Sequence, residues 1–242
     1  MKALILAAGM ASRLRPLTDT RPKCLLQVGN RCLLQRTVDN LLDNGISRIA
    51  VVTGYRAEMI RDFLTATYPQ TDFTFIHNAD YTTTNNIYSL WLAKAFAAAD
   101  DFMLLDSDIL FDGRIIARLL ANKGATLALN SHELGEEEIK VITGDDGLIA
   151  EISKTCCIAD AIGESVGIEK ITAAYSQALF DELDDMIVNE KMSDVFYEKA
   201  FERLIPKGHK FSVTDTTDLF SIELDTVEDF NQAKRLIPEE LY

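Results

Sequence analysis

In residues 2–9, KALILAAG, an unbroken apolar run follows Lys2 and stops at Gly9, and residues 10–26, MASRLRPLTDTRPKCLL, come directly after it. A continuous rather than alternating apolar run is typical of a strand buried on both faces of a parallel sheet. The loop after it carries four cations within eleven positions, with Asp19 as the one acid among them: Arg13, Arg15, Arg21 and Lys23. A chain of net charge −14 therefore concentrates positive charge at the end of its first predicted strand.

A strand that ends in glycine and turns into cations predicts a phosphate site. Backbone N–H groups of such a turn point into a concavity, and nearby Arg and Lys side chains neutralise the anion. The P-loop pattern GxxxxGK[ST] does not follow Gly9, and Ala11 and Leu14 stand where the dinucleotide fingerprint GxGxxG requires glycine. The missing glycines exclude a nicotinamide-dependent oxidoreductase. We expect the cations themselves to wrap a triphosphate along an open loop.

Composition indicates one globular domain in a reducing compartment. The 242 residues are 48% hydrophobic and 26% charged, enough for a single large α/β domain. No apolar run approaches the ~20 residues of a membrane span, and the first residues do not resemble a signal peptide, so we expect a cytoplasmic protein without membrane insertion. The surplus of acid argues against a nucleic-acid partner. The cysteines lack metal-site or CxxC spacing and are expected to be reduced thiols.

Strands and helices alternate in the first half of the chain. Buried strands are predicted at 46–54, 73–77 and 101–108, with helices near 33–42, 56–66 and 86–99, as in right-handed βαβ units on a parallel sheet. After about residue 124 several strand candidates follow with few helices between them, which indicates a mixed or antiparallel extension. Helices are then predicted at 173–189 and 193–204. A last strand pair, KFSVTD and LFSIEL, precedes a closing helix at 227–236.

Residues 6–26 resemble the signature loop of the nucleotidyltransferases that activate sugar phosphates and phospho-alcohols, LAAG-x-G-[ST]-R-[LM]-x-P-x-T…PK-x-L. The resemblance implies a Rossmann-like α/β fold, a single nucleotide-diphospho-sugar transferase-type domain with a mixed central sheet flanked by helices. It also implies one domain over 1–242, with 1–124 mainly binding the nucleotide and 125–242 mainly binding the acceptor. The departure is Ala11, where the family usually has glycine. Alanine there requires a negative φ or some strain.

The resemblance also assigns roles to the loop. Arg13 would grip the β- and γ-phosphates, and Lys23 would contact the α-phosphate and the incoming phosphate, which makes these two the expected catalytic residues. Arg15 matches a frequently basic position, whereas the pattern does not require Arg21. The backbone that faces the nucleotide would come from Leu6, Ala7, Ala8 and Gly9.

Residues 78–93, NADYTTTNNIYSLWLA, resemble the cytidylyltransferase branch that acts on phosphocholine, inositol phosphate and related phospho-alcohols. Asn86 and Ser89 are the expected polar groups near the base or ribose, because amide and hydroxyl groups suit the cytosine edge. Gly54 would let the base approach the backbone. The neighbouring polar residues are first of all candidates for helix caps and turns: Asn78, Thr84 and Asn85.

The stretch LLDSDILF ends a buried strand with Asp106 and Asp108, and carboxylates at that edge of an open sheet are costly unless they serve a cation. The resemblance implies that Asp108 is one ligand of Mg²⁺ and that Asp225, in IELDTVEDF, is the second. For Asp106 two roles are expected. It either supports the nucleotide site by contacting the metal ligands without binding the metal, or it caps a turn. Mg²⁺ takes carboxylate and phosphate oxygens, so it is the expected cofactor.

The acceptor site should come from the second half of the chain. The family places it among segments that here contain Lys140, Lys154, Glu164, Asp194 and Tyr197. A phosphocholine site would need an aromatic cage, to which Tyr197 could contribute one wall. However, Ile139 and Lys140 stand where the phosphocholine enzymes are expected to have an aromatic residue, so inositol-type, sugar or primary-amine acceptors remain open. The acidic run 136–138 is expected to be a solvated face.

These observations predict a Mg²⁺-dependent transfer of CMP from CTP to a phospho-alcohol, a phosphonate or a sugar phosphate, with release of pyrophosphate. The acceptor is already an anionic nucleophile, so a histidine or serine base is not required. One alternative is a sugar-1-phosphate nucleotidyltransferase that uses UTP, dTTP or GTP. Another is a catalytically silent nucleotide-sensing or regulatory domain, although the presence of Arg13, Lys23, Asp108 and Asp225 together argues against it. The oligomeric state and the pathway are left open.

Overall fold

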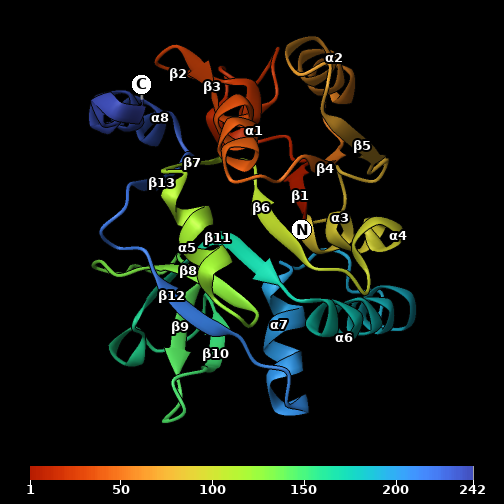
Figure 1. Ribbon diagram of the computed structural model, residues 1–242, viewed down its shortest axis with the longest axis vertical. Coiled ribbons are helices and arrows are strands. Elements are labelled where there is room, and N and C mark those ends of the chain that lie inside the picture. The colour runs from red at the N-terminus through yellow and green to blue at the C-terminus, as the bar shows by residue number, and fades with distance from the viewer. Residues whose placement is uncertain (242) are drawn as a thin grey trace.

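Strand β1 (Lys2–Ala7) lies inside the main sheet and pairs in parallel with two neighbours, β4 (Arg48–Thr53) and β6 (Phe102–Asp106). The computed structural model describes residues 1–241, and Figure 1 shows this sheet running through the middle of the molecule. Strand β5 (Asp72–His77) continues the parallel part beyond β4. The apolar run 3–7 is buried on both faces, as its continuous pattern predicts.

The second half of the chain extends the same sheet. Strand β11 (Gly163–Ile171) pairs antiparallel with β6, and the order across the sheet is β10-β9-β11-β6-β1-β4-β5, with β8 and β12 branching from β11. The sheet therefore contains strands from both predicted halves of the chain. The remaining strands of the extension are β8 (Thr126–Asn130), β9 (Lys140–Thr143), β10 (Ile149–Ser153) and β12 (Ser212–Asp215).

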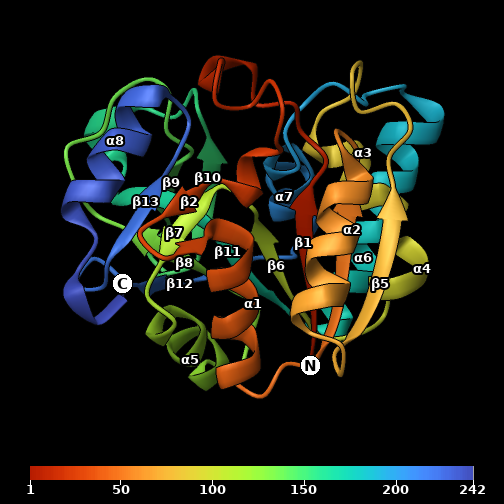
Figure 2. The same cartoon turned by 90° about the horizontal axis from the view of Figure 1, so that it is seen from above.

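Helices cover both faces of the sheet (Figures 1 and 2). One apolar core lies under α1 (Leu33–Asp43), α2 (Ala57–Thr67) and α5 (Arg114–Ala121). The other lies under α3 (Asn86–Leu92), α4 (Lys94–Ala97), α6 (Ala173–Asp184) and α7 (Glu198–Leu204). A third apolar cluster joins α8 (Val227–Leu236) to the opening loop. None of the helices found in residues 1–241 has the length and apolar character that crossing a bilayer requires.

Short elements complete the chain. They are the 3-10 turns at Ser12–Leu14, Lys23–Leu25, Ile158–Asp160, Ile205–Lys207 and Glu239–Leu241, the π-helix at Asp185–Asn189, and the strands β2 (Gln27–Val28), β3 (Arg31–Cys32), β7 (Ile109–Phe111) and β13 (Ser221–Glu223).

The structure confirms the alternating first half and the mixed second half, and it corrects three expectations. The strands KFSVTD and LFSIEL do not pair with each other: β12 pairs with β8, and β13 pairs with β7. The helix predicted at 173–189 becomes π-helical after Asp184, and the one predicted from 193 begins at Glu198. The helix over 86–99 is split at Ala93 into α3 and α4. All four cysteines are free thiols, as expected.

Strand β11 bends where it passes the site. Its pairing with β8 changes register between Ser165 and Glu169, and Gly167 in the bulge has a positive φ of 75°. A β-carbon at Gly167 would lie 3.0 Å from Asp106 Oδ2 and from Ile109 Cδ1. Glycine is therefore required both by the backbone conformation and by the close approach to β6 and β7.

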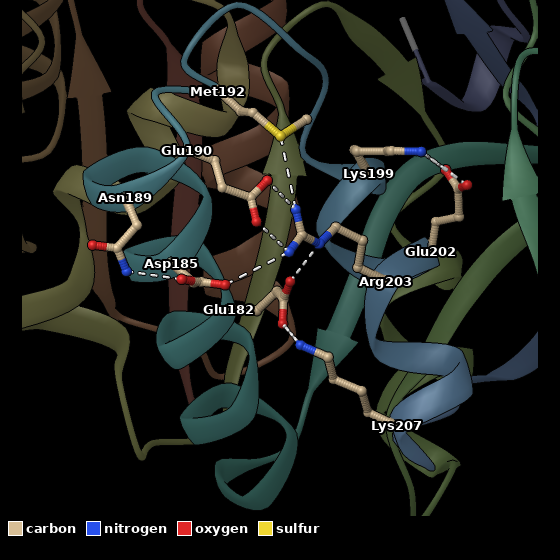
Figure 3. A network of polar contacts seen from close by, with 9 residues as sticks. All are labelled: Glu182, Asp185, Asn189, Glu190, Met192, Lys199, Glu202, Arg203 and Lys207. Atoms are coloured by element: carbon tan, nitrogen blue, oxygen red, sulfur yellow. Dashed lines mark hydrogen bonds and ion pairs between the residues drawn. The ribbon is translucent and has the colours of Figure 1, made fainter.

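Arg203 of α7 connects three segments that carry acids (Figure 3). Its guanidinium lies 2.6 Å from the buried Glu182 of α6 and 3.6 Å from Asp185 at the start of the π-helix. It also forms a forked pair with Glu190, at 2.6 and 2.8 Å. These contacts hold the segment 185–197 against α7, and that segment leads directly into the walls of the cavity described below.

We expect Arg203→Met to lower the free energy of unfolding by about 3 kcal/mol, because it leaves the buried Glu182 carboxylate with Lys207 as its remaining cation. The matched control is Lys199→Met on the same helix, which removes an exposed pair with Glu202 and should cost less than about 1 kcal/mol. Urea unfolding followed by circular dichroism measures both. Equal losses in the two variants would contradict a structural role for the Arg203 network.

Candidate active site

A cavity of about 700 Å³ opens at the carboxyl ends of β1 and β6, where ligands bind in open α/β sheets. Thirteen of the predicted site residues line it: Leu6, Ala7, Ala8, Gly9, Arg13, Lys23, Asn86, Ser89, Asp106, Asp108, Lys154, Glu164 and Asp225. Four predicted residues are not among its lining residues: Gly54, Lys140, Asp194 and Tyr197. The cavity therefore joins segments from both halves of the chain.

The opening loop brings its two key cations to one point. Lys23 Nζ donates to Asp108 Oδ2 at 3.0 Å and to Asp225 Oδ1 at 2.7 Å, and Arg13 also pairs with Asp225. Burial by itself would lower the pKa of Lys23, but the charges of Asp108 and Asp225 outweigh it and raise that pKa. Arg15 pairs with Asp19 on the surface, away from the cavity lining. Of the loop cations, Arg13 and Lys23 therefore face the site.

Ala11 takes the conformation that glycine would take. Its φ of 47° and ψ of 53° lie in the left-handed region, and its carbonyl accepts a hydrogen bond from Thr18 Oγ1 at 2.9 Å. A left-handed alanine costs roughly 1–2 kcal/mol relative to its usual conformations. Of the two conformations expected for alanine here, the loop therefore adopts the strained one with positive φ, and the backbone does not rearrange to a negative φ.

Three carboxylates form a candidate metal centre. Oxygens of Asp108, Glu223 and Asp225 lie within 4.8 Å of one another. Enclosure by the cavity walls and the charges of Asp108 and Asp225 raise the pKa of Glu223 to about 8, whereas Lys23 and Arg13 hold the pKa of Asp225 below its usual value despite its burial. Three carboxylates with oxygens this close together are suited to a hard divalent cation. The residues present therefore fit Mg²⁺ or a similar ion.

The start of α8 holds Asp225 in place. Thr226 caps the helix, and the Asp229 carboxylate accepts hydrogen bonds from the backbone N–H groups of Asp225 at 3.1 Å and Thr226 at 2.7 Å. This capping box fixes the backbone on which Asp225 stands. The capping box, which is a local sequence motif, therefore positions Asp225, although the cations that Asp225 contacts lie far from it in the sequence.

Polar residues around α3 form the nucleotide end of the cavity. Asn78 Nδ2, which is buried, donates to Thr84 Oγ1 and Ser89 Oγ, both at 3.1 Å. Asn85 caps α3, as expected for asparagine at a helix start. Asn86 Oδ1 accepts a hydrogen bond from the backbone N–H of Tyr197 at 2.9 Å, so this side chain also ties α3 to the start of α7.

Gly54 supports the cavity from behind. A β-carbon there would lie 2.6 Å from Ala8 O and 2.7 Å from Tyr81 Cβ. Its small size therefore lets the opening loop and Tyr81, which lines the cavity, pack against β4. The sequence analysis expects the nucleotide base to approach the backbone at Gly54. In the structure the atoms that approach Gly54 closely belong to Ala8 and Tyr81.

The opposite end of the cavity is lined by charged residues of the second half. His132 Nε2 and Glu164 Oε1 are 2.7 Å apart, and Lys154 Nζ lies 3.2 Å from Glu137 and 4.9 Å above the Phe196 ring. The acidic run 136–138 is solvent-exposed or half-buried as expected, but Glu137 and Glu138 also line the cavity.

Three residues predicted for the acceptor site occupy other positions. Lys140 is buried, and its ammonium donates to three backbone carbonyls, including that of Lys154 at 2.7 Å. Asp194 is exposed, and its carbonyl faces Asn85. Tyr197 is fully buried beneath the cavity, where its hydroxyl lies 3.2 Å from both Asp106 Oδ2 and Glu169 Oε1.

Sequence reasoning missed Glu223, Glu198 and the His132–Glu164 pair. Glu223 carried a usable signal, because residues two apart on a strand point to the same side and Glu223 precedes Asp225 by two. Glu198 lies in a helical segment whose phase the sequence did not fix. His132 and Glu164 are 32 positions apart and meet only through the sheet.

A cation-rich loop after the first parallel strand, with carboxylates facing it from the next strand, defines a nucleotide-binding transferase site. Residues 3–202 match the model of the MobA-like NTP transferase domain, and the chain belongs to that family. The predicted nucleotidyltransferase family and the predicted fold are thus confirmed.

Named relatives include cytidylyltransferases. The chain is 29% identical to CMP-5'-(3-aminopropyl)phosphonate synthase of Streptomyces rubellomurinus, over 96% of this chain but only 38% of that protein. It is 29% identical to choline-phosphate cytidylyltransferase of Streptococcus pneumoniae, over 99% of this chain and all of that protein. A solved structure of CTP:phosphocholine cytidylyltransferase from Streptococcus pneumoniae superposes with a TM-score of 0.81 at 26% identity, covering 98% of this chain and 99% of that one.

We expect Asp108→Asn and Glu223→Gln each to weaken Mn²⁺ binding by at least about tenfold, because each removes one anionic oxygen from the three-carboxylate set. Electron paramagnetic resonance of free Mn²⁺ measures the affinity without any turnover. Asp218→Asn is the matched control, since this exposed acid pairs with Arg118 outside the cavity and should bind Mn²⁺ as the unaltered protein does. Unchanged binding in Asp108→Asn would place the metal elsewhere.

Proposed function

We propose that this protein transfers CMP from CTP to a small phosphate or phosphonate monoester and releases pyrophosphate. The observation that carries the proposal is the meeting of Arg13 and Lys23 with Asp108 and Asp225 beside the backbone of residues 6–9. Such a site neutralises a triphosphate and a leaving pyrophosphate within an otherwise acidic chain. The relatives named for choline phosphate and for an aminopropylphosphonate support an acceptor of this kind.

In the proposed reaction an oxygen of the acceptor's phosphate or phosphonate attacks the α-phosphorus of CTP. A new P–O bond forms, the bond from the α-phosphorus to the bridging oxygen breaks, and pyrophosphate leaves with the electron pair. The attacking oxygen is already anionic, so the chain needs no general base. Catalysis then depends on positioning and on stabilisation of the charge that develops.

Lys23 and Arg13 have different parts in this scheme. Lys23 is nearly buried at the floor of the loop and would act on the α-phosphate, where charge develops. Arg13 is more exposed, at 60% of its side-chain surface, and would bind the β- and γ-phosphates. Both cations are held by Asp225, so the loop keeps them close to where the phosphates would enter.

Asp108, Asp225 and Glu223 would hold the divalent ion, for which we propose Mg²⁺. When bound, the ion supplies positive charge to the phosphate oxygens and helps orient the triphosphate. The chain's own contribution is the rigid placement of these acids, through the end of β6 for Asp108 and through the capping box of α8 for Asp225.

The cytosine preference is proposed from the cluster at α3. Asn86 and Ser89 line the cavity, and their positions are held by bonds to Tyr197 and Asn78. Fixed amide and hydroxyl groups suit a base that presents both a donor and acceptors on one edge.

We expect CTP with Mg²⁺ to raise the thermal unfolding temperature more than UTP, GTP or dTTP do at equal concentration, because stabilisation follows affinity for the folded state. Differential scanning fluorimetry measures the shift. A pyrophosphate-release assay with the same four nucleotides and a panel of phosphate and phosphonate acceptors then tests turnover. A larger shift with UTP or dTTP, and turnover with a sugar 1-phosphate, would replace this proposal with the sugar-nucleotide alternative.

Lys23→Met should lower kcat by about 100-fold or more while changing the KM for CTP much less, because the lost charge matters most in the transition state. Arg13→Met is the comparison and should also raise the KM for CTP, since its phosphate contacts exist in the ground state. Steady-state pyrophosphate release measures both variants. If Lys23→Met weakens nucleotide binding and leaves kcat unchanged, Lys23 is a binding cation only.

A further inference from the structure

Glu198 carries a buried oxygen that has no partner within the described part of the chain. The residue begins α7, lines the cavity and is only 6% exposed, and its Oε2 makes no hydrogen bond to any of residues 1–241. Burial raises its pKa to about 7, with its own backbone N–H and the charge of Lys154 opposing that rise. A buried carboxylate that lacks a partner is costly, so its presence in a cavity wall needs an explanation.

Further acids surround this position. Asp106 lines the same cavity, and Glu169 is fully buried below it, with the Tyr197 hydroxyl 3.2 Å from an oxygen of each. Glu198 therefore belongs to an acidic stretch of the cavity wall.

The cations nearby are committed to other acids. Lys154 lies 3.2 Å from Glu137 and over the Phe196 ring, and His132 is bonded to Glu164. Lys23 and Arg13 are bound to Asp108 and Asp225 at the other end of the site. None of these cations forms an ion pair with Glu198 within residues 1–241, so a cation carried by the ligand can serve as its partner.

The shape of the aromatic surroundings distinguishes two kinds of cation. A trimethylammonium group cannot donate hydrogen bonds and is best bound by exposed aromatic faces. Tyr197 is completely buried and packs edge-on against Phe201 at 5.4 Å. Phe196 is 42% exposed and lines the cavity, as Tyr81 does, but the Lys154 ammonium lies 4.9 Å from the centre of the Phe196 ring and competes with a second cation for it. A primary ammonium instead carries three N–H donors, which suit the free oxygen of Glu198.

We propose that Glu198 is the specificity-determining residue of a subsite for a primary ammonium group on the acceptor. The acceptor is then a zwitterion, with its phosphate or phosphonate near Lys23 and its amine at Glu198. This inference rests on the proposed nucleotidyl transfer, because it concerns the second substrate of that reaction. It selects amine-bearing acceptors over choline-type, inositol-type and sugar acceptors.

The first test compares three phosphonates that differ only at the end of the chain: amino, hydroxy and trimethylammonio, each with two- and three-carbon spacers. With CTP and Mg²⁺ we expect kcat/KM for the amino compound to exceed both others by about 10- to 100-fold, the range for a hydrogen-bonded charged pair. Equal use of the hydroxy or trimethylammonio compound would overturn the subsite while leaving the transfer reaction intact.

The second test uses the variant Glu198→Gln, which removes the charge of the side chain and keeps its volume. We expect kcat/KM for the amino compound to fall by about tenfold or more, mainly through KM, while the hydroxy compound changes less than about threefold. Glu202→Gln is the matched control, because Glu202 lies on the same helix and pairs with Lys199 outside the cavity. An equal loss for both compounds in Glu198→Gln would assign Glu198 a structural role and overturn the proposal.

Binding measurements separate the two hypotheses. Isothermal titration of the three phosphonates, with Mg²⁺ and α,β-methylene-CTP present, reports affinity without chemistry. Amine-selective binding that is lost in Glu198→Gln, combined with no pyrophosphate from any acceptor, would overturn the proposed function and support the subsite. Binding without preference for the amine would overturn the subsite, and the unaltered protein alone decides this if the variant does not fold.

Discussion

The Lys23 ammonium lies between two carboxylates, Asp108 and Asp225, which stand 85 and 202 positions away from it in the chain. This contact joins the opening loop, the end of β6 and the start of α8 at one point. Each partner alone would destabilise the fold. The Lys23 ammonium would be a nearly buried, unpaired charge, and Asp108 and Asp225 would repel the nearby Glu223. The arrangement balances these charges against one another. In the proposed reaction the same groups contact the phosphates and a divalent ion.

Charge is distributed unevenly along the cavity. The cations Arg13 and Lys23 of the opening loop and the acid Asp106 at the end of β6 line it together with Glu164 and Glu198 from the second half of the chain. A substrate pair with negative phosphates and one positive group matches this distribution better than a uniformly anionic pair. The overall acidity of the chain thus has a local function in this cavity, where it contrasts with the cationic loop.

The elements behind the cavity explain how these groups keep their places. The bulge at Gly167 brings β11 against Asp106, and Asn86 ties α3 to the backbone of Tyr197. Arg203 holds the segment before α7 through Glu182 and Glu190 (Figure 3). The position of Glu198 therefore depends on helix packing at some distance from the cavity, because its own helix has only seven residues.

Local patterns predicted much of the fold. Continuous apolar runs identified β1, β4 and β6, and helical spacing identified α1 and α8, because burial and periodicity act within a few neighbouring residues. The same patterns could not pair the last two strands, since KFSVTD and LFSIEL look alike in sequence and join different partners. They also failed at 185–197, where a π-helix and a charged network replace a regular helix.

The sequence by itself determined the loop cations, the acids at the end of β6 and the family to which they belong, because these lie in short contiguous motifs. Only the tertiary structure decided that Glu223 joins Asp108 and Asp225 and that Tyr197 is buried below the cavity. It also decided that Glu198 lines the cavity with one buried oxygen that has no hydrogen-bond partner among residues 1–241. The physical reason is that a side chain's environment depends on which strands and helices pack against it. Those partners lie tens to hundreds of positions away, beyond the reach of any local pattern.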